Sequence, residues 1–379
     1  MPGAGTIATA QRHLKNCVRL FPRGARMGLL DTPEAGRGED ELPVSSQATA
    51  GDGGPGSGTK GKEAIKEGAG TMVKSVAFAG QVLLTCSVAL ITQASKRGGA
   101  SYTYNTLTVP FFSEVLKLLL SVALLTRECL SSSSPPFRFS VRNLLAASVP
   151  ALLYLITNNF NFIIIHEIGA LSFQILNNFK IVTAAILFQI IMRRQLTPLQ
   201  WRGILLLTVG SLLSQLKDCS TGGFAMTGTA KGYLLKTVNC TLTSFAGVYC
   251  EKFLKHTSDS IHYQNLQLYF WGTLFASTSL VVSGSSSGGG LQELWRGQNL
   301  YSVSLIFNYA FVGLATAFVL KYLDNIAKNF AAVTAMFVAA LAANVLFQEP
   351  LTIHLAIGLA VAGMAADLYV RHNRLAPSP

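Results

Sequence analysis

The segment IGALSFQILNNFKIVTAAILFQII, residues 168–191, decides the fold class. It is long enough to cross a bilayer, because a membrane helix needs about 20 mostly apolar residues. Its one ionisable side chain, Lys180, lies about 11–12 residues from either end, or about 17 Å at about 1.5 Å per residue. The segment therefore predicts a transmembrane helix with a cation near its centre.

The rest of the chain has the same apolar character. Half of its 379 residues are hydrophobic, only 13% are charged, and the mean hydropathy is +0.40. A soluble chain carries about 25% charged residues. Residues 1–70 hold eight of the 18 acids and nine of the 30 bases, so the shortage of charge lies downstream. This composition argues against a soluble enzyme and predicts an all-α polytopic membrane protein.

Ten apolar runs have the length of a membrane span. They are residues 73–94, 105–125, 143–165, 168–191, 201–217, 229–254, 262–283, 301–322, 327–347 and 351–370. An even number of spans places both termini on one side of the membrane. On that side lie Arg127, Arg138, Arg142, Arg193, Arg194, Arg202, Lys252, Lys255, Arg371 and Arg374. The opposite loops hold only Lys96, Arg97, Lys217, Lys231 and Arg296. The positive-inside rule then predicts cytosolic termini.

The apolar runs imply three regions. Residues 1–71 are expected to form a disordered tail, because this Gly-rich, polar stretch buries too little apolar surface to offset its ordering entropy. Residues 72–371 form the ten-helix domain, and residues 372–379 form a cytosolic C-terminal tail. The first 30 residues lack acids but contain five bases, which is also typical of an organellar transit peptide. The favoured interpretation is instead a cytosolic tail, or an upstream extension with the true start at Met27 or Met72.

Lys180 is too deep to reach water by extending its side chain. A charge at mid-membrane costs about 2.5–3.5 kcal/mol, so it should face a cavity or a partner. A substrate role is favoured, and a buried ion pair with Glu114 is the alternative. Lys328 lies near the start of its span, where it can reach the interface. Glu114 and Lys117 share a helix face at i, i+3 and could pair with each other.

Amide and phenol groups also fall inside predicted spans. They are Tyr154, Asn158, Asn159, Gln174, Asn177, Asn265, Gln267 and Tyr269. Interhelical hydrogen bonding accounts for some of them. With the lysines, the rest would suit a cavity for a polar anion with hydrogen-bonding edges. Lys321, Asp324 and Asn325 lie in one polar turn, where they could cap a helix or pair locally.

Catalytic and metal-binding patterns do not stand out. The six cysteines form no C-x-x-C pair, the six histidines are scattered, and no Asp-Asp pair is present to hold a metal. The sequence therefore predicts neither an enzyme nor a protein with a cofactor or metal. No basic helix suggests nucleic acid as a partner. The expected partners are a small anionic solute and the lipid bilayer, and a homodimer is allowed.

The two sets of five spans contain a related string. NFKIVTAA begins at Asn178, and KNFAAVTA begins at Lys328, so each places a lysine shortly before a Thr/Ala-rich run. With five spans per half, such repeats would be inverted, which places a substrate site near the midplane between the halves.

A series of short strings occurs in order between about residues 73 and 370. They are Ser148-Val-Pro-Ala-Leu-Leu-Tyr154 with Asn158-Asn159, Phe173-Gln174 with Lys180-Ile181, Leu199-Gln-Trp201, Phe245-Ala-Gly-Val-Tyr249 with Glu251-Lys252, Asn265-Leu-Gln-Leu-Tyr269, and Gly313-Leu followed by Lys321-Tyr-x-Asp-Asn325-Ile-x-Lys328. Together they resemble Golgi nucleotide-sugar transporters. The likeness is to the CMP-sialic acid, UDP-galactose and UDP-N-acetylglucosamine branch of the drug/metabolite transporter superfamily.

The resemblance implies ten helices in two inverted halves. It also implies antiport of a cytosolic nucleotide sugar against a luminal nucleoside monophosphate across the Golgi membrane. Lys180 and Lys328 would then contact phosphate. The remaining substrate-binding residues would be Tyr154, Asn158, Gln174, Asn265, Tyr269 and Thr316, supported by Glu114, Lys117, Lys321, Asp324 and Asn325.

The chain departs from the pattern of CMP-sialic acid carriers in the expected nucleotide pocket. Phe173 replaces a tyrosine, and Asn177-Asn178 replaces Tyr-Gln. These changes favour UMP and a UDP-sugar somewhat over CMP and a CMP-sugar. A sugar-phosphate translocator of the same superfamily in a plastid envelope is the alternative, since it would use two lysines in the same way.

Overall fold

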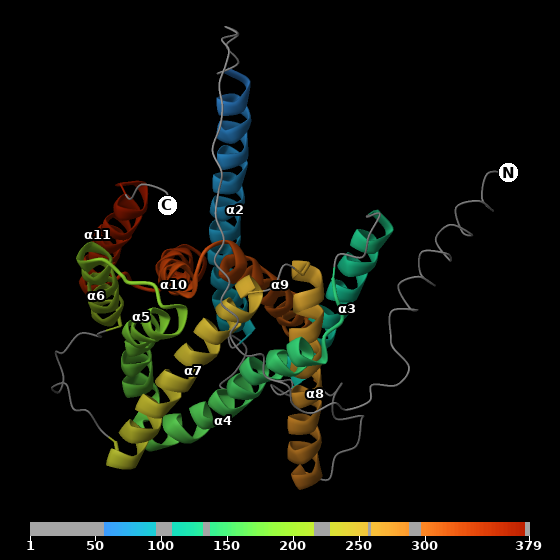
Figure 1. The fold of residues 1–379 in the computed structure, drawn as a ribbon. Coiled ribbons are helices and arrows are strands. Elements are labelled where there is room, and N and C mark those ends of the chain that lie inside the picture. The colour runs from blue at the N-terminus through green and yellow to red at the C-terminus, as the bar shows by residue number, and fades with distance from the viewer. Residues whose placement is uncertain are drawn as a thin grey trace, which may run out of the picture. The chain divides into compact units, whose positions relative to one another are not determined.

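The computed structural model describes residues 57–95, 108–131, 137–215, 228–256, 259–287 and 297–375. Every regular element in these ranges is a helix (Figure 1). The helices are α2 (Ser57–Ser95), α3 (Thr108–Ser131), α4 (Val141–Asn177), α5 (Phe179–Met192), α6 (Pro198–Leu213), α7 (Ala230–His256), α8 (Ile261–Ser287), α9 (Leu300–Tyr322), α10 (Asn325–Phe347) and α11 (Ile353–Leu375). The all-helical class predicted from the sequence is confirmed for these residues.

Within the described residues, six segments are long and apolar enough to span a membrane. They are Thr71–Ser95, Thr108–Ser131, Val141–Gly169, Ser172–Met192, Leu300–Tyr322 and Asn325–Phe347. A shorter apolar helix covers Ile353–Tyr369. Each of the six overlaps a predicted span, and together they identify a polytopic membrane protein.

The chain divides into Met1–Met72 and Val73–Pro379. In the first unit, the described residues form the start of α2, which begins at Ser57 rather than after residue 71. Residues 1–56, which make up most of the predicted tail, and residues 376–379 lie outside the described residues, and so do the polar loops that contain Lys96, Lys217 and Arg296.

The predicted span over 168–191 corresponds to Ser172–Met192, and the structure adds an interruption at Asn178. Gly169 has non-helical angles (φ 74°, ψ 161°), and α4 then continues to Asn177 before α5 begins at Phe179. The break falls at Asn178, whose side-chain amide donates to the carbonyls of Gln174 (3.2 Å) and Ile175 (3.3 Å). An asparagine that bonds the preceding turn in this way satisfies carbonyls at a helix end, which ends α4 next to Lys180.

The helices α6 and α11 lie side by side (Figure 1). Their contact runs over glycines: a Cβ on Gly203 would lie 3.0 Å from the Ala365 carbonyl oxygen, and one on Gly210 would lie 2.9 Å from that of Gly358. Small residues let membrane helices approach at backbone distance. The main apolar core continues from this contact to α5, α7 and α10, through residues such as Phe330.

Candidate functional site

Lys180 and Lys328 each lie in the first turn of a helix. Lys180 is the second residue of α5, directly after the break at Asn178, and Lys328 is the fourth residue of α10, after the break at Leu323–Asp324. Both are partly buried, and they lie within electrostatic range of each other. Neither ammonium group forms a hydrogen bond or ion pair with the described residues. Two unpaired cations this close repel each other, and an anionic ligand would relieve that repulsion.

Cys250 lies close to Lys328 and to the two tyrosines that were predicted to bind substrate. Its thiol on α7 lies within electrostatic range of Lys328, of Tyr154 on α4 and of Tyr269 on α8. Tyr269 is buried and Tyr154 is partly buried. The fold therefore brings four of the predicted substrate-binding residues into one region, although they are distant in the sequence.

The predicted amides differ in their surroundings. Asn265 is fully buried on α8, and neither its amide nitrogen nor its oxygen has a hydrogen-bond partner among the described residues. Buried polar groups are nearly always paired, so an unpaired amide is ready to bind a ligand. Asn158 and Gln174 are exposed on α4, whereas Thr316 on α9 donates to Gln81 Oε1 of α2 (3.1 Å).

Glu114 and Lys117 form an ion pair within α3. The Lys117 ammonium also lies 4.8 Å from the centroid of the Tyr269 ring. Gly313 leaves room for this lysine, since a Cβ there would lie 2.5 Å from Lys117 Cδ. The alternative in which Glu114 pairs with Lys180 is wrong, because Lys180 has no ion-pair partner among the described residues.

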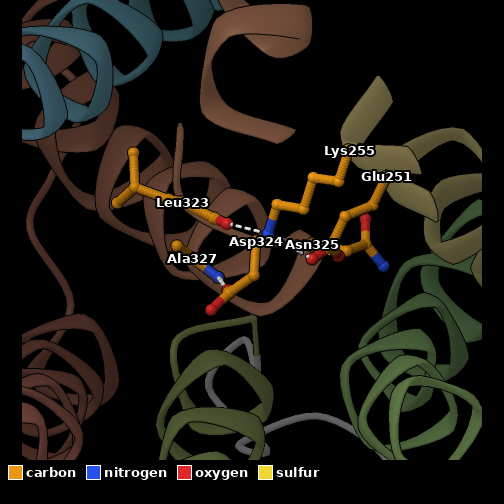
Figure 2. Close-up of polar contacts among 6 residues, drawn as sticks. All are labelled: Glu251, Lys255, Leu323, Asp324, Asn325 and Ala327. Carbon is orange, nitrogen blue, oxygen red and sulfur yellow. Dashed lines mark hydrogen bonds and ion pairs between the residues drawn. The ribbon is translucent and has the colours of Figure 1, made fainter. Parts of the chain in front are cut away.

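The polar turn between α9 and α10 is tied to α7 (Figure 2). Glu251, which is fully buried, accepts from the Lys255 ammonium (2.7 Å) and from the Asn325 backbone N–H (2.8 Å). Lys255 also donates to the carbonyl of Leu323. Asp324 caps α10 by accepting from the N–H of Ala327 (2.6 Å). This network fixes the start of the helix that carries Lys328.

Lys321, in the last turn of α9, contacts residues around the start of α8. Its ammonium donates to Gln264 Oε1 (2.6 Å) and to the Asp259 carbonyl (3.0 Å). It therefore joins the end of α9 to the start of α8. These bonds place Lys321 in a structural role, apart from the two unpaired lysines.

One further lysine near Lys180, Lys236 on α7, was not predicted from the sequence. It is 1% exposed, its ammonium donates to Asn177 Oδ1 (3.0 Å), and it lies within electrostatic range of Lys180. The available signal was the one that identified Lys180, a lysine inside a predicted span. The less apolar composition of residues 229–254 made that signal weaker.

These features define a class: a polytopic helical membrane protein with unpaired lysines and amides in its interior. The model of the family described as nucleotide-sugar transporter matches residues 69–370. The chain belongs to the nucleotide-sugar transporter family, as its sequence predicted. That family is a family of transporters.

Relatives and a solved structure agree with this assignment. The CMP-sialic acid transporter 1 of Arabidopsis thaliana is 35% identical over 295 residues, which cover 76% of this chain and 86% of the relative. The CMP-sialic acid transporter 1 of Oryza sativa subsp. japonica is 33% identical over 293 residues, covering 76% and 91%. One crystal structure superposes with a TM-score of 0.60 at 14% identity, over 80% of this chain and 99% of the other, which supports the fold alone.

Proposed function

We propose that this protein is a pyrimidine nucleotide-sugar antiporter of the Golgi membrane with cytosolic termini. It exchanges a cytosolic UDP- or CMP-sugar (UDP-galactose, UDP-N-acetylglucosamine or CMP-sialic acid) for luminal UMP or CMP. The observation that carries the proposal is the unpaired, mutually repelling pair of Lys180 and Lys328. The names of the relatives, which specify CMP-sialic acid, support a pyrimidine nucleotide.

The site residues have separate roles in this proposal. The phosphate groups bind between Lys180 and Lys328 and neutralise them, since lysine binds phosphate as a point charge. Tyr154 and Tyr269 border the same region, and Asn265 supplies an amide whose donor and acceptor are both free. Asn158, Gln174 and Thr316 contribute from α4 and α9, with Thr316 exchanging its bond to Gln81 for one to the ligand.

The packing of the helices supports two inverted halves, α2 to α6 and α7 to α11. Helices at equivalent positions in the two halves pack on each other, namely α3 on α8 and α6 on α11. One further pair of contacts also exchanges: α3 packs on α9, and its counterpart α8 packs on α4, the counterpart of α9. Such symmetry allows the halves to rock about a central site, which is the geometry of alternating access.

Exchange in proteoliposomes tests the proposal. Purified full-length protein is reconstituted with UMP, CMP, AMP or inorganic phosphate inside, and uptake of labelled UDP-galactose, UDP-N-acetylglucosamine and CMP-sialic acid is measured. Preloaded UMP or CMP should stimulate uptake, whereas AMP and phosphate should not. An uptake rate that is the same with and without internal UMP or CMP would refute antiport. Stimulation by inorganic phosphate alone would favour the translocator alternative.

A further inference from the structure

A third lysine lies close to Lys180, one of the two lysines proposed to bind phosphate. Lys236 is almost completely buried on α7, and its ammonium is 3.0 Å from Asn177 Oδ1 and 3.5 Å from the centroid of the Phe173 ring. Both partners are on the last turn of α4, just before the break at Asn178. The contacts of Lys236 are therefore to an amide and an aromatic face, which carry no net charge.

The face of α7 that carries Lys236 packs along the helix break. One turn after Lys236, the Cys240 thiol donates to the Leu176 carbonyl (3.6 Å), and a further turn along, the Ser244 hydroxyl donates to the Lys180 carbonyl (3.0 Å). Lys236 is consequently held next to the α4–α5 junction, within electrostatic range of Lys180. Its position is fixed by three consecutive turns of packing.

The three lysines lack matching negative charge. Among the described residues, no carboxylate pairs with Lys180, Lys236 or Lys328. The carboxylate within electrostatic range of Lys328 is Glu251, which is already bonded to Lys255. An ammonium has three N–H donors, and Asn177 takes only one of those of Lys236. Buried cations are costly without a counter-charge, so this site is suited to a ligand that brings three negative charges.

We propose that Lys236 is a specificity-determining residue that favours nucleotide sugars with a third negative charge, such as a carboxylate on the sugar, over those with a neutral sugar. The inference rests on the proposed function. A diphosphate supplies two negative charges, which match Lys180 and Lys328. A sugar carboxylate supplies the third, which matches Lys236 and uses its remaining donors.

A matched pair of ligands isolates the third charge. UDP-glucuronic acid and UDP-glucose differ only in a carboxylate that replaces a CH₂OH group, and both are tested as inhibitors of labelled nucleotide-sugar uptake by the reconstituted full-length protein. The unaltered protein should bind UDP-glucuronic acid about tenfold more tightly. Lys236→Met should reduce this ratio to about one while changing UDP-glucose inhibition by less than about threefold.

The control removes the same charge from the same helix. Lys231 has a side chain that is 72% exposed and lies 3.7 Å from Glu167, so Lys231→Met should keep the preference for UDP-glucuronic acid. Lys236→Gln keeps a hydrogen-bond donor for Asn177, and it serves if the methionine variant does not fold. It should lose the preference in the same way.

Two outcomes would overturn the inference. The first is equal inhibition of uptake by UDP-glucuronic acid and UDP-glucose in the unaltered protein. The second is an equal loss of inhibition by both ligands in Lys236→Met, which would indicate a structural role. Neither result contradicts the proposed function, provided that UMP or CMP still inhibits nucleotide-sugar uptake. If neither monophosphate nor any nucleotide sugar competes, the proposed function itself has failed.

Discussion

Replacing Glu251 tests whether its buried network holds the α9–α10 turn on α7 (Figure 2). Glu251→Ala leaves the backbone N–H of Asn325, a residue 1% exposed, without its acceptor at 2.8 Å. An unsatisfied buried donor costs about 1–3 kcal/mol. The lost ion pair with Lys255 adds less than about 1 kcal/mol, because the Lys255 side chain is 31% exposed and water screens it. The free energy of unfolding should therefore fall by about 3 kcal/mol.

Thermal unfolding of the purified protein in detergent measures this loss. A chain of this size loses about 2 °C in Tm per kcal/mol, so Glu251→Ala should unfold about 6 °C lower. Glu251→Gln keeps an oxygen that can accept from Asn325 and should lose about 2 °C. Glu349, an exposed carboxylate, is the control, and Glu349→Ala should change the Tm by less than about 1 °C. If Glu251→Ala unfolds within 1 °C of the unaltered protein, the network does not hold the turn.

Three further predictions concern the lysine site, the buried amide and the glycine contact. Lys180→Ala should abolish nucleotide-sugar uptake while leaving normal amounts of protein in the membrane, and uptake at the normal rate would contradict its role. Asn265→Leu should raise the Tm of the ligand-free protein by about 2 °C, because it removes two unsatisfied polar atoms, and should lower nucleotide affinity at least tenfold. A lower Tm with unchanged affinity would show that the amide is structural. Gly358→Ala places a Cβ 2.6 Å from the Gly210 carbonyl oxygen and should cost about 1–3 kcal/mol in thermal unfolding. Gly363→Ala, on the same helix with nothing within 4 Å of the added Cβ, should be neutral or stabilising.

Much of the fold could be predicted because lipid imposes one strong rule. A run of about 20 apolar residues must satisfy its backbone within a helix, so spans such as 301–322 could be placed within a few residues of α9. The break at Asn178 could not be predicted in this way. The break depends on the hydrogen bonds that the Asn178 side-chain amide donates to the preceding turn, and hydropathy contains no information about hydrogen-bond partners.

The candidate site was predictable only in part, for a similar reason. A lysine near the middle of an apolar run stands out, so Lys180 was found from local sequence alone. Lys236 was overlooked because its role follows from contacts with α4 residues 59 and more positions earlier in the chain. Whether Glu114 pairs with Lys117 or Lys180 also depended on tertiary packing, since spacing permitted the local pair without excluding the distant one.

The glycine contact between α6 and α11 has a mechanical consequence. Side chains can change rotamer when helices slide, but two backbones in direct contact have no such freedom. Displacement along this contact would force carbonyl oxygens such as that of Gly358 into the neighbouring helix. In the proposed two-half arrangement, α6 and α11 should therefore act as a fulcrum, with the larger movements at the opposite end of each proposed half.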